Sequence, residues 1–184
     1  MDKKETSTKG QWRKKLDGFL AFLLFIVILP LIPFLILGYF IWRLIWGTWL
    51  GFLVKSQWYP QGKYMLFVYS ISPNWKEYIE TNILPRISAH AMIINWSDRN
   101  QWNWKKKPLE FRVFKHWTGV IEYSFKGKKK WDGNEFCPVA ITFIPWWRRK
   151  IFRFWQPFKD FKHGKEKPLK ELEAQLFKIL EIVK

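Results

Sequence analysis

The sequence predicts an α/β domain behind an N-terminal membrane anchor, and three observations lead to this fold class. Residues 19–41 form 23 consecutive positions without a charge, and about 20 apolar residues are enough to cross the ~30 Å hydrocarbon core of a bilayer. Behind them, short apolar runs alternate with segments that have helical spacing. The last two runs are joined by a short basic turn, which requires an antiparallel strand pair.

The N-terminal tail, residues 1–17, is polar, and its first 15 positions hold six basic and two acidic residues. It resembles the basic start of a signal peptide. The apolar run that follows is too long for one, however, and no A-x-A-like cleavage site comes after it. We therefore expect residues 18–55 to remain in the protein as an anchor.

Two topologies fit this anchor. In the first, one helix spans the bilayer over residues 19–41, and residues 42–54, with their tryptophans, lie along the interface. The second is a hairpin that reverses at residues 30–33, where Pro30 and Pro33 interrupt the apolar run. A proline in a membrane helix is tolerated and often only kinks it, so both topologies stay open. The basic domain favours a cytoplasmic location.

Residues 56–63 read as a linker, since Pro60 and Gly62 break regular structure. The domain, residues 64–184, begins with an apolar run at 64–69 that is typical of a buried strand. Asn74 and Glu77 match a capping box for a helix that Pro85 ends or kinks. A second strand is expected at residues 91–96.

The second half of the domain begins with a helical region that Pro108 breaks, so that its second piece covers residues 109–117. Residues 123–136 are polar and indicate an exposed loop that can hold a short hairpin. Strands follow at 139–144 and 151–155, and they are joined by the turn at 146–150. A final helix starts at Pro168.

The resulting order, β-α-β-α-β-β-α, resembles the thioredoxin fold. The turn after the first strand falls where thioredoxins carry a Cys-x-x-Cys pair, and here it reads Ser72, Pro73, Asn74 and Trp75. Pro138, directly before the third strand, stands where thioredoxins carry a cis-proline. Because neither cysteine of the pair is present, the resemblance implies a domain without dithiol oxidoreductase activity. The chain is also similar to uncharacterised membrane-anchored thioredoxin-like proteins.

Cys137 is the only cysteine, so the chain can form neither an intramolecular disulfide nor a zinc cluster of cysteines. In the resembling fold its thiol would lie near the Ser72–Trp75 turn. Two interpretations remain for it: a reactive thiolate, or a small buried apolar side chain. The three histidines show no spacing typical of metal ligands, so we expect no metal site and no cofactor.

Three basic triplets stand beside tryptophans in the domain, where residues 56–184 hold 24 basic and 12 acidic residues. Basic residues interleaved with tryptophan suit anionic lipid head groups, and they also suit single-stranded nucleic acid; plain solvation is the third interpretation. The candidate binding residues are Lys105, Lys106, Lys107, Lys128, Lys129, Lys130, Trp146, Trp147, Arg148, Arg149 and Lys150.

These observations favour an integral membrane protein whose redox-inactive domain acts as an interaction or scaffold module at a membrane surface. Its expected partners are the lipid bilayer, anionic lipids and an unidentified protein. Two alternatives remain: a single-thiol enzyme that uses Cys137, and a membrane-tethered nucleic-acid binder. No complete catalytic motif is present, which favours a role other than catalysis.

Overall fold

The computed structural model describes residues 28–101, 108–119, 121–125, 128–132, 137–144 and 149–181. It has the α/β class that the sequence predicts, with a long apolar helix near its start and a mixed four-stranded sheet. The chain divides into two compact units, Met1–Trp46 and Gly47–Lys184.

The described part of the first unit is helical throughout. A short 3-10 helix, η1 (Leu29–Leu31), leads into α2 (Ile32–Gln57), and the residues that flank η1 also have right-handed helical dihedrals. The hairpin alternative is therefore wrong, because the chain does not reverse at residues 30–33. Pro30 lies in η1 and Pro33 in α2, so both prolines are accommodated within helical backbone.

The last three turns of α2 belong to the second unit and bury one face. Gly47, Leu50 and Val54 are buried there, at positions that share one side of a helix. Trp49 and Phe52 stack on each other on the exposed side of this segment. Residues 42–54 are thus part of the continuous helix, and we find no separate interfacial segment.

Residues 56–63 are folded rather than a free linker, which corrects our expectation. They contain the end of α2 and the short 3-10 helix η2 (Tyr59–Gln61). Trp58 is fully buried, with its ring against Phe143, and the Tyr59 hydroxyl donates a 2.6 Å hydrogen bond to the Phe143 carbonyl. The aromatic side chains of this segment outweigh the breakers Pro60 and Gly62.

All four predicted strands are present and form one mixed sheet. In the order β2-β1-β5-β6, β1 (Met65–Tyr69) is parallel to β2 (Ala91–Asn95) and antiparallel to β5 (Val139–Thr142), and β6 (Lys150–Arg153) is antiparallel to β5. Parallel pairing of β1 and β2 follows from the helical crossover between them.

That crossover is one helical stretch in three pieces: α3 (Lys76–Tyr78), a π-helical segment η3 (Ile79–Ile83) and α4 (Leu84–Ile87). The π segment comes directly before Pro85, which has no N–H for the regular ladder. The predicted capping box is wrong. Trp75 holds the cap position without a side-chain cap hydrogen bond, and the Asn74 side chain accepts from Lys162 instead.

Past β2 the chain forms η4 (Trp96–Gln101), α5 (Leu109–Thr118), and the hairpin of β3 (Ile121–Phe125) with β4 (Lys128–Asp132). The hairpin confirms the alternative considered for this polar region. The expected strand at 151–155 ends early, because Trp155 begins a helix, α6 (Trp155–Lys162). The last helix, α7 (Lys167–Glu181), starts within one residue of its predicted position.

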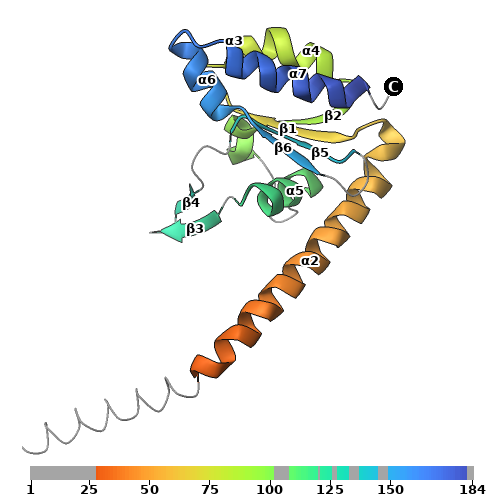
Figure 1. The fold of residues 1–184 in the computed structure, drawn as a ribbon, viewed down its shortest axis with the longest axis vertical. Coiled ribbons are helices and arrows are strands. Elements are labelled where there is room, and N and C mark those ends of the chain that lie inside the picture. The colour runs from red at the N-terminus through yellow and green to blue at the C-terminus, as the bar shows by residue number, and fades with distance from the viewer. Residues whose placement is uncertain are drawn as a thin grey trace, which may run out of the picture. The chain divides into compact units, whose positions relative to one another are not determined.

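The sheet has helices on both faces (Figure 1): α3, α4, α6 and α7 on one side and α5 on the other. On the first side Met65, Phe67 and Tyr69 of β1 join one hydrophobic core with helix residues such as Ile83 and Leu176. The alternate residues of β1, Leu66 and Val68, are also fully buried. A strand buried on both faces reads as a continuous apolar run, as this one does.

Candidate functional site

The turn after β1 is held by its own backbone and by one tryptophan. The Ser72 carbonyl accepts hydrogen bonds from the backbone N–H of Trp75 (3.2 Å) and of Lys76 (2.9 Å). The Trp75 indole N–H donates to the Ser70 carbonyl at 3.1 Å. These contacts set where Asn74 and Trp75 lie at the start of the crossover helix.

Strand pairing brings Cys137 and Pro138 to the same end of the sheet as this turn. Val68 of β1 lies opposite Val139 of β5, so the two residues before Val139 stand beside the end of β1. The Cys137–Pro138 peptide bond is cis. The Cys137 Sγ lies 3.7 Å from the Val68 carbonyl oxygen, to which it donates.

The environment of Cys137 opposes a reactive thiolate. The residue is 8% exposed. Burial raises the pKa of its thiol to about 12, and a hydrogen bond with the Ser70 side chain offsets only part of that effect. A thiol with such a pKa is protonated at neutral pH, and the thiolate is the nucleophilic form. The structure therefore favours the interpretation of Cys137 as a buried apolar side chain.

A cavity of about 310 Å³ lies between the turn and α6, and we call it the turn cavity. Trp75 packs near Phe158, with ring centroids 6.1 Å apart. Lys162 Nζ donates a 3.1 Å hydrogen bond to Asn74 Oδ1, and Lys159 Nζ lies 5.0 Å from the centroid of the Trp155 ring. The cavity is lined by Asn74, Trp75, Trp155, Phe158, Lys159, Lys162 and His163.

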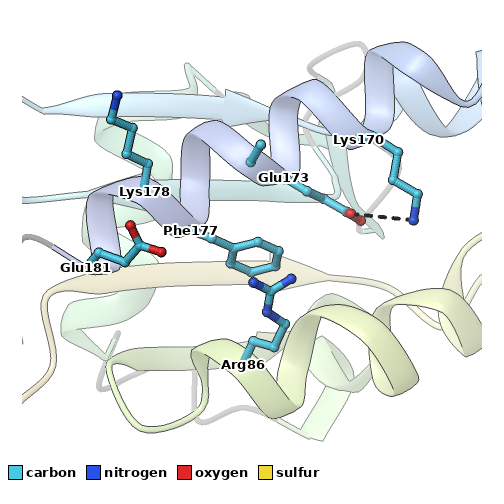
Figure 2. A pocket seen from close by; sticks show the side chains of 7 residues that line it. Arg86, Lys170, Glu173, Phe177, Lys178 and Glu181 are labelled. Carbon is cyan, nitrogen blue, oxygen red and sulfur yellow. Dashed lines mark ion pairs between the residues drawn. The ribbon is translucent and has the colours of Figure 1, made fainter.

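A second cavity, of about 500 Å³, is open to the surface between α4 and α7 (Figure 2). The Arg86 guanidinium carbon lies 3.5 Å from the centroid of the Phe177 ring, a cation–π contact. Lys170 pairs with Glu173 at 3.9 Å, and Lys170 Nζ also donates to the Tyr78 hydroxyl at 2.7 Å. Because side chains of both signs line this cavity, its composition does not select a ligand charge.

The predicted turn residues are thus brought together, whereas most of the predicted basic surface lies outside the described residues. This holds for Lys105, Lys106, Lys107, Trp146, Trp147 and Arg148, and for the side chains of Lys128, Lys129 and Lys130, whose backbone forms β4. Arg149 and Lys150 are exposed. The Arg149 guanidinium lies 4.7 Å from the Trp117 ring centroid, and partial burial lowers its pKa.

Sequence reasoning missed the α6 side of the turn cavity, because it assigns residues 151–155 to a strand and expects no helix between that strand and Pro168. A signal was present, because Phe158, Lys159 and Lys162 follow Trp155 by three, four and seven residues. That spacing places them on one side of a helix.

Across the part of the chain that the structure describes, no group of three or more His, Cys, Asp or Glu side chains could hold a metal ion. Comparison of the sequence with protein-family models and with curated proteins, and of the fold with solved structures, finds no match.

Proposed function

We propose that this protein is a membrane-anchored scaffold whose thioredoxin-like domain binds a partner and has no dithiol redox activity. One observation carries the proposal: the sheet order β2-β1-β5-β6 puts the Ser72–Trp75 turn and the Cys137–Pro138 peptide at the same end of the sheet. In the resembling fold a cis-proline faces the cysteine pair. Here the cis Cys137–Pro138 peptide would face a turn without cysteines, and this end of the sheet is the proposed partner-binding surface.

Redox inactivity follows from the residues at the turn. Ser72 and Trp75 stand at the positions of the cysteine pair in this resemblance, and neither can form a disulfide. The remaining thiol, Cys137, is buried and has a pKa of about 12. Exchange needs an accessible thiolate, so a single-thiol enzyme is disfavoured.

The apolar helix supports the membrane location. Among the described residues, Leu29–Gln61 is the one helix long and apolar enough to cross a membrane by length and composition. Over residues 28–45 its side chains are exposed all round, for example Phe34, Leu35 and Tyr39. A helix that is hydrophobic all round needs a buried or lipid environment.

The charge of the chain suits the surface of an anionic bilayer. The net charge is +17, and each Lys or Arg near such a surface contributes about 1 kcal/mol of attraction. The basic triplets are the proposed lipid contacts, with Trp49 and Phe52 as exposed aromatic residues close to the end of the apolar helix.

Photo-crosslinking in intact membranes tests the scaffold role. A benzophenone side chain would replace Ile71, which is exposed next to the turn, and Ile93 of β2 would serve as the matched exposed control. We expect one partner protein to crosslink from position 71 and not from position 93, and to copurify in stoichiometric amount. Recovery of the protein alone, or with lipid only, would contradict the scaffold role.

A further inference from the structure

The lining of the turn cavity combines aromatic and basic side chains. Trp75, Trp155 and Phe158 supply the apolar surface, and Lys159, Lys162 and His163 supply protonatable nitrogens. Among the residues that the structure describes, no acidic side chain lines it. Ligand sites of proteins are mostly apolar concavities with a few polar groups, and their volumes start at about 300 Å³. The cavity has the volume and lining of a site for a small ligand.

The two lysines are positioned by contacts within the cavity. The Lys162 ammonium is held by its hydrogen bond to Asn74 Oδ1, another lining residue, and an ammonium group has three donors, so two remain. Lys159 lies over the Trp155 ring at 5.0 Å. Asp160, the acidic residue of the same helix, accepts a hydrogen bond from Gln156 at 3.1 Å and is outside the lining.

The cavity between α4 and α7 differs from the turn cavity in the charge of its lining residues. There Lys170 faces Glu173, and Glu181 also lines the cavity, so basic charge is offset within the site. In the turn cavity no lining residue that the structure describes offsets the basic charge. Hydrogen bonds to a charged acceptor are the stronger kind, so the ligand that gains most here is an anion.

From these contacts we infer that the turn cavity binds an anionic group, such as a carboxylate, on an aromatic or alkyl body. The body packs against the half-buried Trp75 and Trp155, and the anion accepts hydrogen bonds from Lys159 and Lys162. The ligand is either a free organic acid or the head-group region of an anionic lipid, which share this chemistry. The inference does not depend on the scaffold role.

The test uses the full-length protein in nanodiscs of zwitterionic lipid, titrated with naphthoate and, in parallel, with the neutral naphthamide, and read by ligand-observed NMR. We expect naphthoate to bind at least about tenfold more tightly than naphthamide, since a charge-assisted hydrogen bond is worth about that factor. The double variant Lys159→Gln, Lys162→Gln should lose that preference. The double variant Lys165→Gln, Lys167→Gln makes the same charge change at exposed residues outside the lining and should keep it.

A second variant, Trp155→Ala, removes part of the aromatic wall at a half-buried position and should weaken both probes, with circular dichroism confirming that the fold is kept. Equal naphthoate binding by the wild type and the double lysine variant would overturn the inference. Nanodiscs with an anionic lipid distinguish the two sources. If the anionic lipid competes with naphthoate, the natural ligand of the cavity is a lipid. If naphthoate binding is unchanged in these nanodiscs, the ligand is a free acid.

Discussion

The two units of this chain use the same apolar residues in opposite ways. In the first unit the side chain of Phe34 is 71% exposed. In the sheet of the second unit Phe67 is 0% exposed, and its ring centroid lies 5.9 Å from that of Phe154. Water penalises the first arrangement and favours the second, because exposed apolar surface costs about 25 cal/mol per Å². The comparison teaches that the helix exposes the kind of surface that a hydrocarbon solvent favours, whereas the second unit buries such residues in its core.

The largest expected effect is from a core phenylalanine. Phe67→Ala should lower the free energy of unfolding of the domain by about 3–5 kcal/mol, because it removes buried apolar surface and leaves a cavity. Phe34→Ala makes the same chemical change at an exposed site and should leave domain unfolding within about 0.5 kcal/mol of the wild type. Chemical denaturation in detergent micelles measures both. Equal losses would break the contrast between the units.

The second largest effect is expected from a charged residue introduced into the apolar helix α2. Leu37 and Ile71 are similarly exposed, at 58% and 51%, but they belong to different units. Leu37→Lys should reduce retention of the protein in membranes, since a lysine near the centre of a spanning helix costs about 3 kcal/mol. Ile71→Lys, in the domain, should leave retention unchanged. Alkaline extraction followed by flotation measures the retained fraction, and equal retention of the two variants would contradict the assignment.

A smaller effect separates two glycines of the same helix. A Cβ at Gly47 would lie 2.7 Å from His116 Nε2, whereas at Gly38 it meets nothing within 4 Å. Gly47→Val should destabilise the domain by about 1–3 kcal/mol, because the His116 ring must move. Gly38→Val should leave domain unfolding unchanged. If thermal unfolding shows no difference between the two variants, the packing of residues 47–57 onto the domain is wrong.

The smallest effect is the pH response of Cys137. Its folded pKa, about 12, is above the ordinary value of 9.0, so the folded state holds the proton more tightly than the unfolded chain. The stabilising contribution is complete below about pH 9 and declines as the pH rises toward the folded pKa. Between about pH 9 and 10 the wild type should lose about 1 kcal/mol more stability than Cys137→Ala. If the wild type and Cys137→Ala lose the same stability over this pH range, the thiol is in contact with water.

The sequence allowed much of the domain to be predicted, and the failures have physical causes. Strands such as β1 were found because both faces are buried, which leaves a continuous apolar run. Helix α6 was missed because Phe152 of β6, Phe154 between the two elements, and Trp155 and Phe158 of the helix form one aromatic run. In such a run the periodicity of a strand cannot be separated from that of a helix. The turn cavity could not be predicted for the same reason, since its second wall is that helix.

Long-range contacts explain why residues 56–63 are folded although a linker was expected there. Residues 56–63 look like a linker by their local breakers, yet Trp58 and Tyr59 are fixed by Phe143, more than 80 positions later. Tertiary packing of this kind overrides local composition and is not visible in a local pattern. The hairpin alternative for the anchor failed because a proline in an apolar helix is tolerated as well as it is in a reversal, and the backbone of residues 28–57 is helical.

The most direct test of the central contrast is the membrane association of the unmodified full-length protein. Membranes that contain it would be extracted with alkaline carbonate and floated through a density gradient, so that integral protein rises with the lipid while peripheral protein and aggregates do not. The exposed apolar helix predicts that the protein floats with the bilayer. Recovery in the soluble fraction, with the domain folded, would contradict the account.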